Sequence, residues 1–122
     1  MPEPITLSFS ADPENLVVVR QVGAATAARC GLSIDRADDA RLAVDEATTL
    51  LIEGGATSIV CAFEVAPGRL EIQVTGQGGR LPSPEELSWT VLHALVNDLT
   101  TLEAGSDNRI TIAIREEQPS LT

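Results

Sequence analysis

The side chains that most often carry out chemistry are few in this sequence of 122 residues. Its two cysteines, Cys30 and Cys61, are far apart and form no C-x-x-C pair, and His93 is the only histidine. A zinc cluster or a thioredoxin-like site needs several such residues at close spacing. We therefore expect two buried, reduced thiols, no metal site, and a histidine on the surface or in packing.

All eight basic residues are arginines, and the sequence has no lysine. This excludes the P-loop, the strand-borne lysine of ordinary protein kinases and every lysine Schiff-base mechanism. A short glycine cluster (Gly76, Gly78 and Gly79) lies ahead of two prolines. Such a cluster is a weak indication of phosphate binding and is equally typical of a flexible turn.

The charge balance is strongly acidic, with 18 acidic residues, 8 basic residues and a net charge of −10. A surface of this sign repels phosphate backbones and anionic lipids, so we expect no direct nucleic-acid or membrane binding. Basic protein surfaces are the natural partners. The start of the chain has neither a basic region nor a long apolar run, which predicts a cytoplasmic protein.

Apolar periodicity predicts the elements of the first half of the chain. Residues 4–10 alternate as a half-buried strand does. Asp12 and the proline after it predict the start of a helix that ends near Cys30. A second helix is predicted from Asp35 to the glycine pair at 54–55, apolar on its inner face and acidic on its outer face.

The second half of the chain predicts a hairpin of strands 57–65 and 70–75 and a final strand over 109–115. Between them, a four-residue apolar spacing predicts a third helix; its positions are Leu87, Val91, Leu95 and Leu99. One further strand fits before the last. This order predicts a single domain over residues 1–122, an α/β (α+β) two-layer sandwich whose mixed, mostly antiparallel sheet has three helices on one face.

Residues 41–50 (RLAVDEATTL) resemble the N-box helix of a known family. This family is that of the GHKL-type, histidine-kinase-like ATPases, in the branch of the anti-sigma-factor serine kinases. Residues 9–11 (FSA), Asn15 and Arg20 match the start of its anti-sigma members, and residues 88–98 look like the helix that follows its ATP lid. The resemblance spans nearly the whole chain and implies the histidine-kinase-like ATPase fold.

The resemblance also shows which catalytic positions are altered. In the family, an N-box glutamate is the general base and an asparagine four residues later binds magnesium. Glu46 matches the glutamate, but Leu50 stands at the asparagine position and offers no oxygen. We therefore interpret Glu46 as vestigial and expect no magnesium ligand.

The other two nucleotide motifs of the family are altered as well. Its D-x-G-x-G motif keeps Gly78, but Gly76 replaces the aspartate and Arg80 replaces the second glycine. Its lid is rich in glycine, whereas this chain has none between Gly79 and Gly105. The cluster of Gly76, Gly78 and Gly79 is then a degenerate nucleotide loop. We expect no cofactor, with nucleotide binding and kinase activity lost.

The resemblance implies an anti-sigma factor that sequesters an alternative, stress or developmental sigma factor until an anti-anti-sigma factor competes. It implies Asn15 and Arg20 as partner-binding residues and a homodimer joined near the first strand and helix. An ion pair of Arg20 with a nearby acid such as Glu14 is the alternative for Arg20. Trp89 is either a core residue or an interface anchor. Two other functions remain open: an active serine kinase that uses ATP and magnesium, and a non-catalytic adaptor domain.

Overall fold

The structure, a computed structural model, describes residues 3–116. These residues form five strands, three α-helices and one short 3-10 helix. In chain order the elements are β1 (Ile5–Ser10), the 3-10 helix (Pro13–Asn15), α1 (Leu16–Arg29), α2 (Ile34–Glu53), β2 (Ser58–Ala66), β3 (Arg69–Gln77), α3 (Leu87–Leu95), β4 (Asp98–Ala104) and β5 (Asp107–Arg115).

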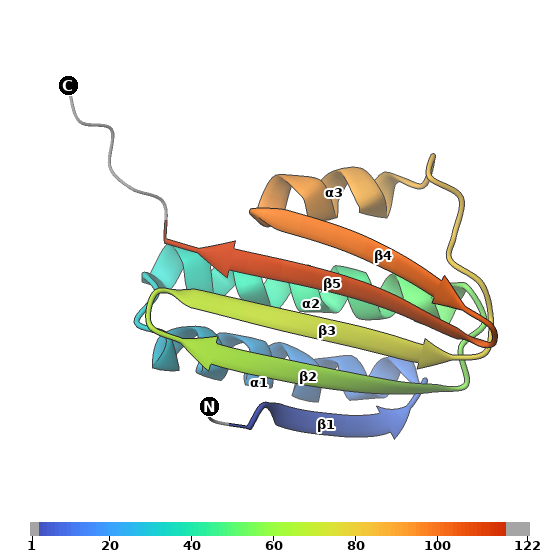
Figure 1. Ribbon diagram of the computed structural model, residues 1–122, viewed down its shortest axis with the longest axis horizontal. Helices are drawn as coiled ribbons and strands as arrows, with labels where there is room; N and C mark the ends of the chain where they lie inside the picture. The colour runs from blue at the N-terminus through green and yellow to red at the C-terminus, as the bar shows by residue number, and fades with distance from the viewer. Residues whose placement is uncertain (1–2, 117–122) are drawn as a thin grey trace.

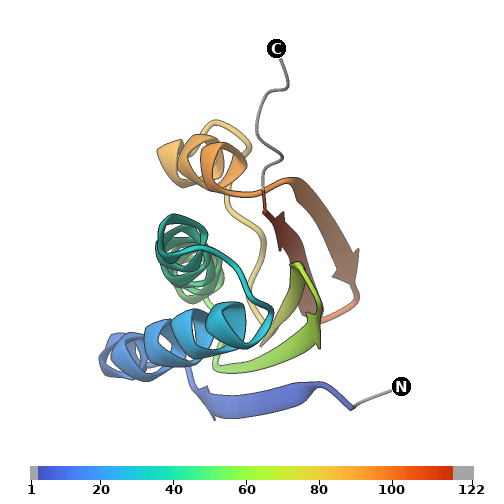
Figure 2. The same ribbon diagram turned by 90° about the vertical axis from the view of Figure 1, so that its left-hand side faces the viewer.

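The five strands form one sheet in the order β1-β2-β3-β5-β4. All four strand pairs within residues 3–116 are antiparallel, so none of the parallel pairing of a mixed sheet occurs there. The three helices lie in one layer against one face of the sheet, with α2 between α1 and α3 (Figure 1, Figure 2). The predicted two-layer α/β sandwich is confirmed.

Local signals in the sequence position both long helices. The Asp12 carboxylate accepts a hydrogen bond from Glu14 N at 2.9 Å, and the turn that it caps leads into α1. At α2 the cap is Ser33, whose hydroxyl accepts a hydrogen bond from Arg36 N at 3.2 Å. This helix therefore begins one residue before the predicted Asp35.

The third helix is shorter than its apolar spacing predicted. α3 ends at Leu95, and Leu99 lies in β4, opposite Ile112 of β5. The chain becomes extended at Val96, with φ −118° and ψ 160°. Leu99 continues the four-residue spacing only because its strand faces the same apolar layer as α3 does.

The core lies between the helix layer and the central strands. It contains Leu50 of α2, Leu92 of α3 and Ile72 of β3, all fully buried. α1 approaches α2 closely at Gly23, which has no side chain. A Cβ atom there would lie only 2.9 Å from Val44 Cγ1. Within residues 3–116, no helix combines the length and the apolar character that a membrane span requires.

Candidate functional site

The segments that the family resemblance singles out meet at one end of the molecule (Figure 1). The end of α2 contacts the loop after β3, where Arg80 N donates a hydrogen bond to Gly54 O at 2.9 Å. That loop continues to the start of α3, where Trp89 Nε1 donates to Pro82 O at 3.4 Å. The fold therefore brings the altered motifs together, and their fit to a nucleotide can be judged.

Leu50 closes the position at which the family holds magnesium. Its side chain is fully buried in the core cluster that also contains Leu92 of α3. Magnesium binds oxygen ligands, and leucine has none. Glu46, one helical turn earlier, is half-buried and has no hydrogen-bond or ion-pair partner within residues 3–116.

Gly76 leaves little space for the aspartate that the family resemblance implies at this position. It is buried on the helix-facing side of β3. A Cβ atom here would lie 3.0 Å from Ala56 Cβ and 3.3 Å from Leu51 Cβ, both closer than ordinary van der Waals contact. A carboxylate at position 76 would need the end of α2 and the following turn to move apart.

The remaining glycines of the loop serve close backbone packing. Gly79 has φ +73°, and a Cβ atom on it would lie 2.5 Å from Gly54 O. Asn108, which is buried, donates from Nδ2 to Gly79 O at 3.1 Å and to Gly78 O at 3.4 Å. Gly78 N donates to Ser106 O at 2.6 Å. These contacts hold the loop against the end of α2 and against the turn before β5.

The segment that replaces the lid offers few backbone donors. Pro82 and Pro84 have no N–H group, whereas a phosphate cradle consists of successive backbone amides. Glu85 and Glu86 follow and are exposed, which adds negative charge at the start of α3. Together with Leu50, these residues do not fit the magnesium–nucleotide site that the family resemblance implies.

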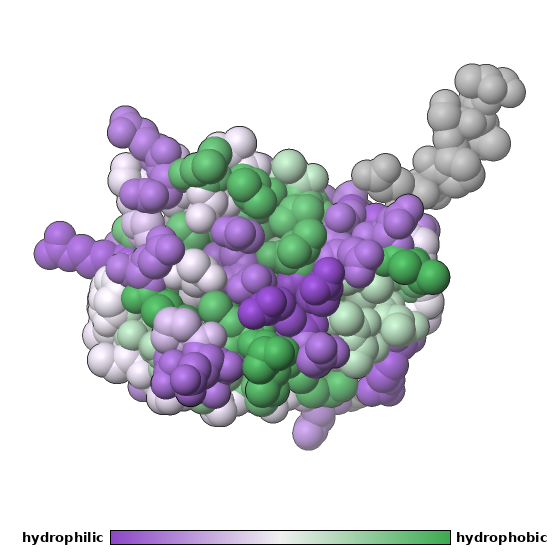
Figure 3. Space-filling model, turned by 180° about the vertical axis from the view of Figure 1, so that it is seen from behind, coloured by the Kyte–Doolittle hydropathy of each residue, from purple (hydrophilic) through white to green (hydrophobic). Residues whose placement is uncertain are grey.

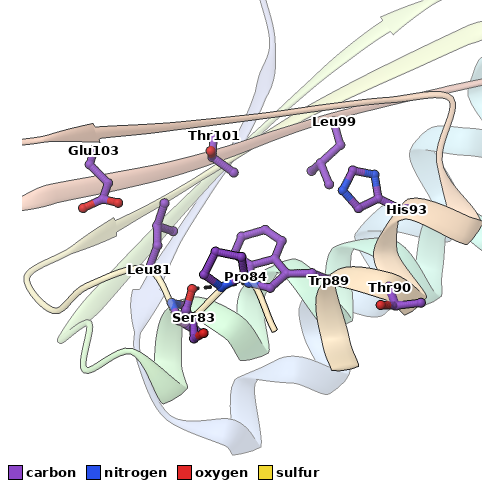
Figure 4. A pocket seen from close by; sticks show the side chains of 10 residues that line it. Leu81, Ser83, Pro84, Trp89, Thr90, His93, Leu99, Thr101 and Glu103 are labelled. Carbon is purple, nitrogen blue, oxygen red and sulfur yellow. Dashed lines mark hydrogen bonds between the residues drawn. The ribbon is translucent and has the colours of Figure 1, made fainter. Parts of the chain in front are cut away.

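A cavity of about 470 Å³ does open nearby, between this segment, α3 and β4 (Figure 4). Its lining residues are Leu81, Pro82, Ser83, Pro84, Trp89, Thr90, His93, Leu99, Thr101 and Glu103. Trp89 lies in the middle, and the β4 side chains face it from the opposite wall (Figure 4). Among these lining residues there is no arginine, and the one carboxylate is that of Glu103. The cavity is therefore unsuited to phosphate.

Arg20 pairs with a nearby acid, which is Asp45 of α2 and not the Glu14 given above as the example. Its Nε lies 3.6 Å from Asp45 Oδ2 and donates a hydrogen bond to Leu16 O at 3.3 Å. The Arg20 side chain remains 38% exposed and that of Asp45 25% exposed. The pair is therefore accessible at the boundary of α1 and α2.

The other two partner-binding candidates lie on different parts of the surface. Asn15 Nδ2 donates to Ser10 O at 3.0 Å, so this side chain links the end of β1 to the start of α1. Trp89 is half-buried on α3. Because α2 lies between α1 and α3, the fold groups Asn15 with Arg20 but places Trp89 on the far side of α2 (Figure 2).

Both cysteines are free and buried, as predicted. Burial raises the pKa of the Cys61 thiol to about 12, against a smaller opposing effect of the Thr48 hydroxyl. Burial also raises the pKa of Cys30, whose Sγ donates to Arg69 O at 3.3 Å. Across residues 3–116, no three histidine, cysteine or acidic side chains group as metal ligands would.

Sequence reasoning missed one buried arginine that positions α3. Arg36 donates to Arg115 O at 2.9 Å, Leu95 O at 3.3 Å and Asn97 Oδ1 at 2.6 Å, and it pairs with Asp39 at 2.7 Å. These contacts hold the junction of α3 and β4 against the start of α2. No spacing rule marks such a residue, because three of its four partners are distant in sequence and two of those are backbone carbonyls.

Comparison with known proteins defines the class. Residues 9–114 match the model of the histidine kinase-like ATPase domain, and the chain belongs to this family. The chain is 31% identical over 105 residues to the anti-sigma-F factor RsbW of two Mycobacterium tuberculosis strains, CDC 1551 / Oshkosh and H37Rv. That alignment covers 83% of this chain and spans 62% of the relatives' length.

A solved structure supports the same fold. The RsbU and RsbW domains of a Mycobacterium tuberculosis protein superimpose with a TM-score of 0.76 at 20% identity. The superposition covers 98% of this chain and 34% of the other. The family predicted from residues 41–50 and the start of the chain is therefore confirmed.

Proposed function

We propose that this chain is an anti-sigma-factor domain acting in the cytoplasm. It binds an alternative sigma factor, keeps it from core RNA polymerase, and releases it when an anti-anti-sigma factor competes. The observation that carries this proposal is the 31% identity over 105 residues to proteins named anti-sigma-F factor. Because the chain spans 62% of those relatives, their activity is transferred here only as a proposal.

The charge of the chain supports a basic protein partner. Its net charge of −10 attracts the basic surfaces with which sigma factors meet promoter DNA and polymerase. Opposite charge mainly accelerates encounter and selects partners, while close contacts set the lifetime of a complex. A sigma-binding surface should therefore combine charge with exposed apolar side chains.

The boundary of α1 and α2 has this combination. The accessible pair of Arg20 and Asp45 lies one helical turn from Val17 on α1 and from Leu42 on α2. Val17 is 53% exposed and Leu42 is 42% exposed. Apolar and hydrophilic side chains are interspersed over the helical face of the molecule (Figure 3). We propose that Arg20 contacts the sigma factor from this boundary.

We also propose that nucleotide binding and kinase activity are lost. Leu50, the filled position at Gly76 and the prolines of the former lid support this proposal. A ligand at about one hundred times its dissociation constant adds about 2.7 kcal/mol to stability. We expect no thermal stabilisation by magnesium–ATP, either in the native chain or in Leu50→Asn, with an ATP-binding relative as positive control. Saturable stabilisation would favour the kinase instead.

A homodimer joined near β1 and α1 is the proposed assembly. β1 is an edge strand of the described sheet, and Ile5 on it is 37% exposed. On α1, Val18 is 48% exposed and shares a helix face with Val22 and Ala25. Val18→Asp should lower the mass measured by light scattering from dimer to monomer. Val17→Asp, on the α2 side of the helix, is the control.

Transcription in vitro tests the proposed function. The purified chain should inhibit core polymerase charged with one alternative sigma factor of the source organism, and an anti-anti-sigma factor should relieve the inhibition. Arg20→Ala should weaken inhibition, whereas Arg29→Ala, which removes an exposed arginine from the same helix, should not. A chain that inhibits no sigma factor would be an adaptor domain.

A further inference from the structure

One edge of the sheet is open in a way that the proposed sigma-binding surface does not use. β4 (Asp98–Ala104) ends the strand order and pairs only with β5 within the described residues. Such an edge presents unpaired backbone N–H and C=O groups, and proteins often protect it with proline or lysine. Residues 98–104 contain neither.

The helix-facing side of this strand is also uncovered. Thr101 lies opposite the buried Ile110 and therefore points toward the helix layer, as Glu103 does two residues on. Both are nevertheless exposed, because α3 packs mainly against α2. The space left between α3 and β4 is the cavity of about 470 Å³ around Trp89 (Figure 4). A pocket with mixed walls, apolar at Leu81, Trp89 and Leu99, thus lies directly beside a free strand edge.

The charges beside this edge select the occupant. Asp98 pairs with Arg115 at 3.2 Å, whereas Glu103 has no ion-pair partner within residues 3–116. A second copy of the chain would bring another acidic strand and a further net charge of −10. Like charges on adjacent strands are destabilising. An inward-facing glutamate at an edge therefore disfavours pairing between copies and favours a strand that carries arginine or lysine.

We propose that the edge of β4 and the Trp89 pocket together bind an extended, basic segment of a protein partner as a sixth strand. Its backbone pairs with β4, one apolar side chain enters the pocket, and a basic side chain on the same face meets Glu103. Strand addition of this kind draws affinity from the backbone and specificity from alternate side chains. The proposal rests on the proposed function only for the identity of the partner.

Trp89 provides the signal for a direct test, because it is the only tryptophan and the chain has no tyrosine. The full chain is titrated with a synthetic peptide as long as β4 (7 residues). Every second residue of this peptide is threonine, and the residues between the threonines are valine or arginine. Two further peptides carry N-methyl groups on the odd or on the even backbone amides. We expect saturable change in Trp89 fluorescence, and loss of binding by at least about tenfold in only one methylated peptide.

Two pairs of variants separate the contribution of the pocket to peptide binding from that of the charge. Thr101→Phe fills the pocket and should abolish the change, whereas Thr100→Phe, on the opposite face of β4, should not. Glu103→Arg should weaken binding about three- to tenfold, and Glu64→Arg on β2 should have no effect. Each variant is compared with the native chain by circular dichroism and thermal melting.

Three results would overturn the proposal: no fluorescence change, equal binding of both methylated peptides, or a dimer of the chain that Thr101→Phe abolishes. Failure here is distinguishable from failure of the proposed function, because the peptide experiment contains no sigma factor. Transcription inhibition that survives Thr101→Phe, without peptide binding, would reject the sixth strand alone.

Discussion

The two sides of α2 differ in how tightly the molecule is closed. Toward α1, Gly23 allows backbone approach to Val44, and Arg20 pairs with Asp45 across the helix boundary. On the other side, Arg36 of α2 holds the C-terminal end of α3 through Leu95 O. A cavity of about 470 Å³ remains between α3 and β4. Both helices pack against α2, and the opening on the α3 side lies between α3 and β4.

This difference shows that the molecule is closed at the end of α2 and open at the sheet edge beside β4. The end of α2, where the family holds its ligand, is filled here by Leu50 and by the loop after β3. The opening that the structure describes lies at the sheet edge, where Glu103 is the one carboxylate among the lining residues and no arginine lines the cavity. Neither the proposed sigma-binding surface nor the proposed site at β4 includes Leu50 or Gly76, although residues 81–84 of the loop after β3 line the pocket beside β4.

The largest effect should come from the closed contact at Gly79. Gly79→Ala places a Cβ atom against backbone and keeps a left-handed φ of +73°, so we expect a loss of about 3–5 kcal/mol in the free energy of unfolding. Gly68 has the same φ of +73° but open space around it. Gly68→Ala should cost only about 1–2 kcal/mol in urea unfolding. Equal losses would mean that the loop after β3 is not closely packed.

Arg36 should give the next largest effect, since it attaches α3 to the rest of the molecule. Arg36→Ala leaves Asp39, Asn97 and two carbonyls without their donor, and we expect a loss of about 3 kcal/mol. Arg41→Ala removes an exposed arginine 3.8 Å from Asp38 and should cost under about 0.5 kcal/mol. Trp89 fluorescence should shift only in the Arg36 variant. An unchanged stability would show that α3 is held by apolar contacts alone.

The burial of Cys61 can be tested by the loss of stability at alkaline pH. The pKa of the Cys61 thiol rises from 9.0 to about 12 on folding. The contribution of this thiol to the free energy of unfolding is therefore complete below pH 9 and is lost as the pH rises toward 12. At pH 11 we expect a loss of about 3 kcal/mol. The chain has no lysine or tyrosine, so the two cysteines are the side chains that titrate there. Cys61→Ala should flatten the pH dependence of urea unfolding; an unchanged slope would contradict the burial of this thiol.

Arg20 should have the smallest effect on stability and a clear effect on binding. Its pair with Asp45 is 3.6 Å long and partly exposed, so Arg20→Ala should cost under about 0.5 kcal/mol of stability. Sigma binding should weaken by about 1–3 kcal/mol. Arg29→Ala is the control in both calorimetry and binding. Equal losses of stability and binding would make Arg20 a structural residue.

Most of the fold was predictable because short-range sequence signals determine where its helices and strands begin and end. The alternation of residues 4–10, the cap at Asp12 and the glycine pair after α2 each act within a few residues. The error at Leu99 arose where two elements share one apolar layer, so a helical spacing ran on into a strand. Periodicity alone cannot separate these cases.

The candidate site was only partly predictable. The motif positions Leu50 and Gly76 could be compared with the family pattern from the sequence, and the structure adds that both are packed against neighbours. The sequence could not predict the partner of Arg20, because Asp45 comes near it only through tertiary packing. It could not predict the cavity at Trp89 either, because Glu103 comes near Trp89 in the same way. Contacts between segments far apart in the chain leave no local signal.

The most direct test of the central claim is biolayer interferometry of the full chain against each alternative sigma factor of the source organism, with and without magnesium–ATP. The account predicts saturable binding to one sigma factor, weakened by Arg20→Ala, with the same dissociation constant in both conditions. Binding to none of them, or binding that requires magnesium–ATP, would contradict it.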